Sequence, residues 1–355
     1  MKIAAFNVKR LGWEKVNKKA VREIIIKIMS QYSVVVLLEV MDETGGDPMK
    51  LLLQHLNAYG DNRSNPYGML CSERLGPEGR QEKFVYFYRK DEVEIEDSYQ
   101  YRGNAVLTRK PFAVLLHFPN TAVQNLVLIP VHTKPSAAEA ELIALHEVVK
   151  DVREKWKKDN IMILGDFNAD GQYLSKKKKE KLRISWAPFR WLIVDDVDTT
   201  TSSITQNTYD RIVVYGESIA IVPDSAKAYN FKKELNLTQE QTKTVSDHKP
   251  VEVDLIGGMR EVKREVKPEV EPEVEQEVEL VERMGKLEVK LEVELEVKPE
   301  VKPEVKLMVQ LMVQLMVQLE LEQEVEQEVE QEVELVELEL ELELEQMAQR
   351  KRNLV

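Results

Sequence analysis

The sequence changes in character at Gly257-Gly258, and this change limits where a packed domain can form. From Glu261 onward, valine and leucine alternate with glutamate, lysine and glutamine in short repeats that contain proline and no aromatic residue. A strict four-residue spacing does not stay on one face of a helix with about 3.6 residues per turn, and proline interrupts helices and strands alike. We therefore predict one folded domain over residues 1–256 and a low-complexity, largely disordered acidic tail over residues 257–355.

The charged residues are divided unevenly between these two parts. The formal net charge is −13, yet residues 1–256 carry 37 Lys and Arg against 35 Asp and Glu, whereas residues 257–355 carry 13 against 28. The first part is nearly neutral, at +2, and the tail carries −15. Because like charges repel, a partner rich in phosphate would bind the first part rather than the tail.

Membrane insertion and disulfide formation are not expected from this sequence. No apolar run approaches the ~20 residues that a transmembrane helix needs. No charged segment, apolar segment and cleavage site precede the first predicted strand, so no signal peptide is visible. Cys71 is the only cysteine, which excludes an intramolecular disulfide.

Apolar strands alternate with amphipathic helices along residues 1–256, and this order favours two packed sheets covered by helices. Continuous apolar or aromatic runs predict strands over residues 2–7, 34–40, 84–89, 93–101, 112–118, 125–131, 161–164, 211–214, 218–222 and 251–255. Helical spacing predicts helices over residues 17–31, 48–58 and 136–156, the last capped by Ser136.

The segment ILGDFNAD, residues 163–170, places polar side chains directly after a buried strand. Asp166 and Asn168 are two residues apart, so they project from one side of an extended chain. Carboxylate and amide groups of this kind suit a hard divalent cation and a phosphate. Taken alone, the pattern is more often a turn, because Asp and Asn are common turn formers.

Other polar residues stand at the ends of predicted strands, and they change this interpretation. Asn7, Glu39 and Asp166 can converge with His132 and His248 on one rim of a two-sheet sandwich. Phosphodiester hydrolysis needs a base for the attacking water, an acid for the leaving oxygen and charge stabilisation at the phosphate. Histidine can serve in either proton-transfer role near neutral pH, and an adjacent carboxylate fixes its tautomer and raises its pKa.

Seven segments in order give this part of the chain a family resemblance: MKIAAFN, VVVLLEV, QEKFVYFYR, VHTKPSAAEAEL, ILGDFNAD, TYDRIVV and VSDHKPVEV. Together they resemble the deoxyribonuclease I family, within the endonuclease/exonuclease/phosphatase superfamily, over residues 1–256. The resemblance implies a four-layer α/β sandwich of two mixed sheets flanked by helices. It also implies a secreted, monomeric, metal-dependent endodeoxyribonuclease that cleaves double-stranded DNA to 5′-phosphate ends with low sequence specificity. The implied cofactors are Mg²⁺ and Ca²⁺, with Mn²⁺ able to substitute.

The resemblance also assigns roles by position. The implied catalytic residues are Glu82, His132, Asp210 and His248. The implied metal ligands are Asn7, Glu39, Asp166, Asn168 and Asp247, and a structural calcium site is implied at Asp198 and Thr200. The implied DNA contacts are Arg109, Tyr209, Thr205 and Asn168. The sequence leaves open which histidine is the acid.

Several positions depart from the family pattern. Met41 stands where the family carries an arginine that reaches the minor groove, and Arg80 stands where a tyrosine is usual, so groove binding is expected to differ. Gly171 and Asn207 fill the positions of the family's disulfide. In the strand that contacts actin in some members, Met69 and Cys71 replace a tyrosine and a valine, so actin binding is not expected.

Two other classes of function stay open. One is a phosphatase or apurinic-site nuclease of the same superfamily, which TYDRIVV and the loop after His132 disfavour. The other is a binding protein with weak catalysis, which the complete set of catalytic residues disfavours. Outside the rim, we interpret His55, His117 and His146 as packed or surface residues, and Asp42, Asp195 and Asp196 as surface acids.

Overall fold

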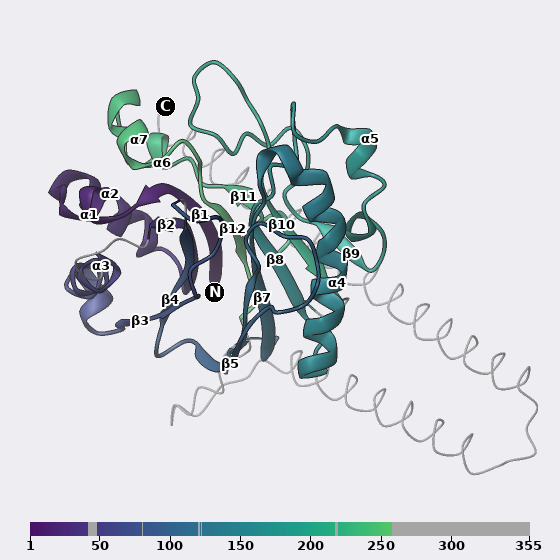
Figure 1. Cartoon of the computed structure of the whole chain (residues 1–355). Coiled ribbons are helices and arrows are strands. Elements are labelled where there is room, and N and C mark those ends of the chain that lie inside the picture. Colours follow the sequence, from purple (N-terminus) through teal and green to yellow (C-terminus); the bar gives the residue numbers. More distant parts are fainter. Residues whose placement is uncertain (42–47, 80, 120, 122, 217–218, 258–355) are drawn as a thin grey trace, which may run out of the picture. The chain divides into compact units, whose positions relative to one another are not determined.

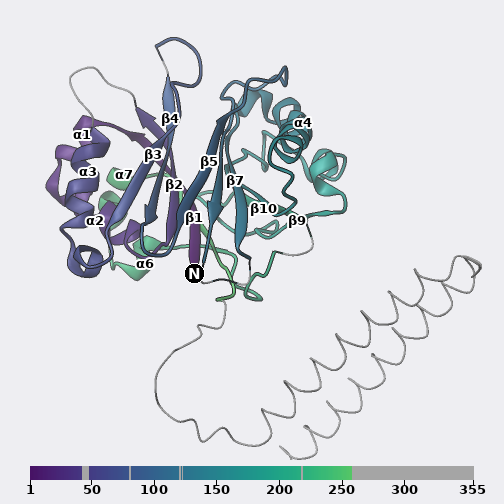
Figure 2. The ribbon, with the colours of Figure 1, turned by 90° about the horizontal axis from the view of Figure 1, so that it is seen from below.

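The computed structural model describes residues 1–41, 48–79, 81–119, 121, 123–216 and 219–257. They belong to one compact unit in which two sheets face each other, with helices on the outer face of each sheet (Figures 1 and 2). This arrangement confirms the predicted four-layer α/β sandwich. The predicted tail lies outside the described residues.

The first sheet contains six strands in the order β11-β12-β1-β2-β4-β3. Strands β1 and β2 are parallel, and the other neighbours are antiparallel. The strands are β1 (Lys2–Leu11), β2 (Val34–Met41), β3 (Tyr67–Cys71), β4 (Glu82–Arg89), β11 (Lys227–Ala228) and β12 (Val251–Asp254).

The second sheet contains six strands in the order β5-β6-β7-β8-β10-β9. Here β7 and β8 are parallel, and the other neighbours are antiparallel. The strands are β5 (Glu94–Gln100), β6 (Phe112–His117), β7 (Asn125–His132), β8 (Ile161–Asp166), β9 (Phe189–Trp191) and β10 (Asp210–Tyr215). Both sheets are therefore mixed, as predicted.

The helices form the two outer layers (Figures 1 and 2). The first sheet is covered by α1 (Trp13–Asn17), α2 (Lys19–Met29), α3 (Pro48–Asn57), α6 (Phe231–Glu234) and α7 (Gln239–Val245). The second sheet is covered by α4 (Ala138–Trp156), with the short α5 (Lys176–Lys179) nearby. Three short 3₁₀ helices are η1 (Gly60–Arg63), η2 (Pro135–Ala137) and η3 (Arg183–Ser185).

Continuous apolar runs occur because both faces of each central strand are buried. In β2, Val34, Val36 and Leu38 contribute to the core between the sheets, whereas Val35 and Leu37 contact the helices outside. Successive side chains of a strand point to opposite faces, so a strand that is covered on both sides needs apolar residues at every position. The run VVVLL is therefore a signature of the middle layers of this sandwich.

Strand register brings the polar residues of the predicted rim to one end of both sheets. In the second sheet, His132 at the end of β7 pairs with Asp166 at the end of β8, and Asp166 pairs with Asp210 at the start of β10. In the first sheet, Asn7 pairs with Leu38, directly before Glu39. Residues far apart in the sequence therefore reach the same edge through hydrogen-bonded strand pairs.

The helix predicted between residues 17 and 31 is α2, and a short helix that was not predicted, α1, precedes it across the extended backbone of Lys18 (φ −74°, ψ 100°). Other local predictions were wrong. Ser136 lies inside η2 and does not cap α4, which begins at Ala138 without a side-chain cap. Residues 219–222 of the strand predicted over 218–222 form only an isolated bridge, from Ile221 to Leu255. Strands β3, β9 and β11 are too short to give a clear alternation in the sequence.

Within the described residues, no helix is both long and apolar enough to cross a membrane.

Candidate active site

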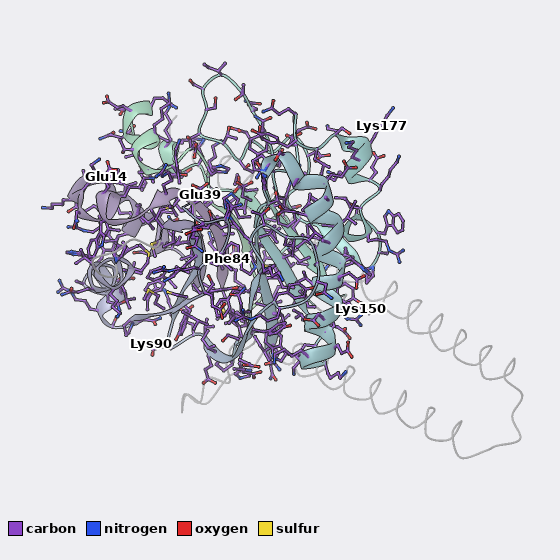
Figure 3. All side chains as sticks on the ribbon, in the orientation of Figure 1. Glu14, Glu39, Phe84, Lys90, Lys150 and Lys177 are labelled. Carbon is purple, nitrogen blue, oxygen red and sulfur yellow. The ribbon has the colours of Figure 1, made fainter. Side chains whose placement is uncertain are left out.

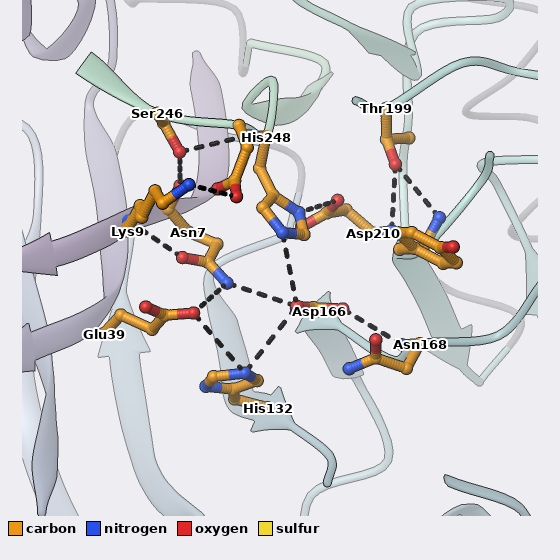
Figure 4. A network of polar contacts seen from close by, with 12 residues as sticks. Asn7, Lys9, Glu39, His132, Asp166, Asn168, Thr199, Asp210, Ser246 and His248 are labelled. Atoms are coloured by element: carbon orange, nitrogen blue, oxygen red, sulfur yellow. Dashed lines mark hydrogen bonds and ion pairs between the residues drawn. The ribbon is translucent and has the colours of Figure 1, made fainter. Parts of the chain in front are cut away.

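The rim contains two histidine–carboxylate pairs that face the same aspartate. Figure 4 shows one of them, His248 with Asp210, and His132 on the other side of Asp166. His132 Nδ1 lies 2.6 Å from Glu82 Oε1, and His248 Nδ1 lies 2.7 Å from Asp210 Oδ2. The other ring nitrogen, Nε2, lies 3.7 Å from Asp166 Oδ2 in both histidines. The structure thus brings together four predicted catalytic residues around one predicted metal ligand.

Short backbone pairings hold His248 beside Asp210. Thr200 forms an isolated bridge with His248, and the amide of Lys249 donates to the Thr199 carbonyl at 2.7 Å. The Thr199 hydroxyl oxygen accepts hydrogen bonds from the amides of Tyr209 and Asp210, at 3.0 and 3.1 Å. The segment before β12 is therefore tied to the start of β10, although the two belong to different sheets.

The pKa values of both histidines are raised above the ordinary value of an imidazole. Burial lowers the pKa of His132, but the hydrogen bond and charge of Glu82 outweigh burial, so that the pKa is raised overall. Burial also lowers the pKa of His248, and the charges of Asp210 and Asp166 raise it to about 10. Burial raises the pKa of Asp210 itself, which His248 partly offsets.

Carboxylate oxygens also converge between the two histidines. Asn7 Nδ2 donates to Glu39 Oε1 at 3.0 Å and to Asp166 Oδ2 at 3.2 Å, while Asn7 Oδ1 accepts from the amide of Lys9. Glu39 Oε1 lies 3.8 Å from His132 Nε2. Two carboxylates in this arrangement suit a hard divalent cation. Asn7 points its nitrogen at them, so in this conformation it orients the ligands rather than acting as a ligand.

A second group of possible ligand atoms overlaps the first. One atom each from Asp166, Asp210 and His248 can be chosen so that all three lie within 4.8 Å of one another. His248 and Asp210 already bind each other, which makes Glu39 and Asp166 the more suitable pair for a cation. Asp166 belongs to both groups.

Strained backbone accompanies these residues. Glu39 and Asn168 have positive φ angles of 56° and 47°, which L-residues seldom adopt and which concentrate at functional sites. Lys9 and Arg10 also have positive φ, and the register between β1 and β2 shifts at this point. The resulting bulge carries the Arg10 amide to 3.1 Å from Glu39 Oε2.

Gly165 controls how closely β8 approaches β7. It has a φ of 136°, and a Cβ atom added there would lie 2.2 Å from the Val131 carbonyl oxygen and 3.0 Å from Leu38 Cδ2. A residue with a side chain would therefore push against the neighbouring strand immediately before Asp166.

The remaining predicted metal ligands lie at the edge of this group. Asn168 is buried, and its amide nitrogen Nδ2 donates to the Thr133 carbonyl at 3.1 Å, while its backbone amide donates to Asp166 Oδ1. Asp247 is half-exposed and forms a 2.6 Å ion pair with Lys9. Burial raises the pKa of Asp247, but Lys9 and His248 outweigh burial and hold it below its usual range.

Arg109 lies against the His132 pair. Its Nε atom is 2.9 Å from Glu82 Oε1, close enough for an ion pair, and its Nη1 atom donates to the His132 carbonyl at 3.3 Å. The Arg109 side chain is 14% exposed, so most of it lies within the protein. Its predicted phosphate contact stays a prediction, and the structure adds a contact to the Glu82 carboxylate.

Tyr209 and Thr205 line a cavity of about 370 Å³ beside His248. Lys9 and Lys243 line it too, together with hydroxyl side chains of the loop over residues 200–205. The rings of Tyr209 and His248 have centroids 6.5 Å apart. The cavity therefore presents hydroxyl groups and ammonium groups directly next to the His248–Asp210 pair.

The predicted calcium site at Asp198 and Thr200 already contains a cationic side chain. Lys249 Nζ lies 2.6 Å from Asp198 Oδ2 and 3.0 Å from the Asp198 carbonyl oxygen, while the Thr200 amide and hydroxyl donate to Asp198 Oδ1. Both charged side chains are largely buried. A calcium ion would have to displace this ammonium group, so the residues present do not fit the ion well.

The family departures fall in three places. Met41 pairs with Glu82 across β2 and β4, next to the catalytic carboxylate. A Cβ atom added to Gly171 would lie 2.8 Å from Asn207 Oδ1, so these two disulfide positions are adjacent in space. Arg80 lies outside the described residues.

Several supporting residues had no clear signal in the sequence. Lys15 donates to the carbonyls of Val8, Lys9 and Val245 and so holds the bulge of β1, and burial lowers its pKa to about 8. Asp195 was interpreted as a surface acid, and it is partly exposed, but its ion pair was not predicted. It lies 2.8 Å from a guanidinium nitrogen of the fully buried Arg211.

Comparisons with known proteins agree with this geometry. The sequence model of the endonuclease/exonuclease/phosphatase family matches residues 4–248. Deoxyribonuclease-1-like 1 from Homo sapiens is 39% identical over 256 residues, covering 72% of this chain and 84% of the relative. Deoxyribonuclease-1 from Mus musculus is 38% identical over 271 residues, covering 72% of this chain and 91% of the relative.

A solved structure shares the fold at low sequence identity. An endonuclease/exonuclease/phosphatase family protein from Leptotrichia buccalis aligns with a TM-score of 0.53 and 18% identity, covering 72% of this chain and 99% of that chain. The family model matches residues 4–248, and the curated relatives are 38–39% identical over most of their own length. The chain belongs to the endonuclease/exonuclease/phosphatase family and, within it, to the deoxyribonuclease I family.

Proposed function

We propose that this protein is a metal-dependent endodeoxyribonuclease that hydrolyses double-stranded DNA to 5′-phosphate ends with little sequence specificity. The observation that carries the proposal is the pair of histidines whose Nε2 atoms both lie 3.7 Å from Asp166 Oδ2. Membership of the deoxyribonuclease I family supports the choice of DNA as substrate. Secretion and a monomeric state stay predictions from the family resemblance.

The two histidines divide the proton transfers. Each Nδ1 is hydrogen-bonded to a carboxylate, which holds the ring and leaves Nε2 directed at the rim. One Nε2 takes the proton of the attacking water, and the other Nε2 gives a proton to the departing 3′ oxygen. The P–O3′ bond breaks as the water oxygen bonds to phosphorus. One fragment therefore ends in a 3′ hydroxyl, and the phosphate stays on the 5′ oxygen of the other.

A divalent cation such as Mg²⁺, held by the oxygens of Glu39 and Asp166, would neutralise the phosphate and stabilise the charge that develops on it. Asn7 keeps these two carboxylates close together by donating to both. Mn²⁺ offers the same preference for oxygen ligands. The chemistry of the donor set therefore supports metal dependence.

Contacts with the DNA backbone are proposed for the cavity beside His248. Its lysines and hydroxyl groups are the side chains that bind phosphate oxygens most often. Such contacts read no base sequence, which supports low specificity, and their affinity falls as salt concentration rises.

Nicking of supercoiled plasmid tests the proposal. We expect His132→Ala and His248→Ala each to lose about 10²–10⁴-fold in rate, because each removes one proton-transfer group, and EDTA to abolish nicking. His117→Ala is the matched control, since His117 contacts Asn125 far from the rim. Normal nicking by either rim variant would refute the assignment. Cleavage restricted to plasmid that carries apurinic sites would instead support the apurinic-site nuclease.

A further inference from the structure

A second cavity lies on the far side of the second sheet, between α4 and the segment over residues 183–189. Its volume is about 400 Å³, within the range of ~300–1,000 Å³ that small-molecule sites occupy. It reaches Tyr215, the last residue of β10, whereas the catalytic Asp210 is the first residue of that strand. Figure 3 shows Lys150 of α4 well away from Glu39 at the catalytic rim. Nothing in the proposed mechanism uses this cavity.

Cationic side chains surround the cavity, and none of the described residues that line it is acidic. Lys150 and Arg153 come from α4, and Arg183 comes from the opposite wall. Arg153 is paired with Asp159 at 2.6 Å. Among the described residues, no carboxylate lies within ion-pair distance of Lys150 or Arg183, so two positive charges here stay available for an anion.

Aromatic rings form the rest of the lining. Phe189 and Tyr215 lie edge to face, with centroids 4.9 Å apart. Trp186 is 48% exposed, yet its indole nitrogen donates to the Glu180 carbonyl at 2.9 Å, which fixes the ring in place. The Arg183 guanidinium lies 5.3 Å from the Trp186 ring centroid. An exposed, fixed indole beside an unpaired cation is a surface onto which a planar group can stack.

Helix electrostatics do not account for this arrangement. Basic residues in the last turn of a helix interact favourably with its dipole, which is a sufficient reason for Arg153 on α4 but not for Lys150, which lies before that turn. Arg183 and Trp186 lie outside α4, on the other wall, and this explanation does not extend to them. A ligand that carries both a ring and negative charge would use both walls at once.

We propose that this cavity is a binding site for a nucleotide, with the base stacked on Trp186 and the phosphate between Lys150 and Arg183. Base stacking on an aromatic ring contributes roughly 1–3 kcal/mol and tolerates any base. Arginine and lysine are the side chains that bind phosphate. The same chemistry is offered by a free mononucleotide and by a nucleotide within a single strand of DNA.

The indole signals in a ¹⁵N-labelled sample of the full chain test this site. The chain has four tryptophans, and Trp186→Phe identifies the signal of interest. In EDTA, which blocks cleavage, we expect 5′-dAMP to shift the Trp186 signal saturably, and deoxyadenosine and inorganic phosphate each to bind more weakly. A deoxyadenylate decamer in place of 5′-dAMP tells the two sources apart. Tighter binding of the decamer would assign the site to single-stranded DNA, and tighter binding of 5′-dAMP would assign it to a free nucleotide.

Charge reversal supplies the control. Lys150→Glu with Arg183→Glu should raise the half-saturating concentration by at least ~10-fold, which corresponds to about 1.4 kcal/mol. Lys177→Glu, on the exposed surface of α5, makes a matched charge change and should leave binding unaltered (Figure 3). All these side chains are exposed, so the melting temperatures should stay close to that of the parent. An unmoved Trp186 signal with both ligands, or equal binding by the charge-reversed variant, would overturn the proposal.

Discussion

The two catalytic pairs look alike from the rim, but their surroundings differ. Each pair joins the two sheets: His132 of the second sheet meets Glu82 of the first, and His248, just before β12 of the first, meets Asp210 of the second. Arg109 lies beside Glu82, whereas the carboxylate of Asp166 lies near Asp210. The charge of the carboxylate is therefore partly neutralised in the His132–Glu82 pair, whereas a second carboxylate lies near the His248–Asp210 pair.

This difference bears on the proton-transfer roles. Glu82 and Asp166 raise the pKa of His132 against both burial and the charge of Arg109, whereas Asp210 and Asp166 raise the pKa of His248 against burial, to about 10. The histidine with the higher pKa keeps its proton longer and suits the acid role. We therefore expect His248 to be the acid and His132 the base.

Removing the charge of one carboxylate at a time should have the largest effect. Glu82→Gln and Asp210→Asn should each slow nicking by about 10²–10⁴-fold, as the loss of a group that orients a catalytic histidine does. Both variants should also lower the melting temperature, and Glu82→Gln more so, because it leaves both His132 and the largely buried Arg109 without their carboxylate, whereas Asp210→Asn leaves His248 beside Asp166. Nicking rates and thermal unfolding of both variants check this prediction. Equal destabilisation would show that Arg109 does not distinguish the pairs.

The free energy of unfolding of the parent, compared with that of His248→Gln, should depend on pH. A histidine whose pKa is raised on folding stabilises the native state fully below its unfolded pKa of ~6.5, and this contribution is lost as pH rises towards the folded value of about 10. The stability advantage of the parent over His248→Gln should therefore shrink between those two pH values. Urea unfolding in EDTA measures it. An advantage that grew with pH would contradict the sign of the shift.

Removing the ion pair of Lys249 with Asp198, which lies near His248, should have a smaller effect. Lys249→Met should lower the melting temperature by several degrees, because a largely buried Asp198 carboxylate then loses its cation, at a cost of about 1–3 kcal/mol. Calcium should change the melting temperature of the parent little and that of the variant more. Scanning calorimetry with Ca²⁺ or EGTA decides the matter. A strong calcium effect on the melting temperature of the parent would support the predicted calcium site.

Because Gly171 and Asn207 cannot form a disulfide, dithiothreitol should leave both the activity and the melting temperature unchanged.

Deleting residues 259–355 should have the smallest effect. Both catalytic pairs are built from residues up to His248, and the tail is acidic, so it adds no attraction for phosphate. The specific nicking activity of the shortened chain should be unchanged or slightly higher. An inactive or unfolded product would mean that the tail belongs to the domain.

The rim could be predicted because strand ends are recognised from residues that are adjacent in the sequence. Polar residues after apolar runs, as at His132 and Asp166, identify strand ends, and the ends of adjacent strands meet. Partners that depend on how distant segments cross were not predictable. The ion pairs of Arg109 with Glu82 and of Lys249 with Asp198 join residues 27 and 51 positions apart. Nothing in the spacing of either pair marks them as partners.

Helix boundaries show the same limit. Lys18 has a side chain that is common in helices, yet its backbone is extended and separates α1 from α2. The helical spacing of apolar residues begins at Ala20, so the sequence predicted α2 but not α1, in which Val16 is buried. A helix of five residues is too short to show a helical period.

The close contact at Gly165 fixes the separation of β7 and β8 next to the rim. With only a hydrogen in place of a side chain, β7 and β8 approach until the Val131 carbonyl occupies the space of the missing methyl group. His132 and Asp166 are the next residues on these two strands, so the distance between the proposed proton-transfer group and the proposed metal ligand depends on that gap. A lineage could exchange rim residues one by one and keep the scaffold, but a single added carbon atom here would alter the spacing of the whole site.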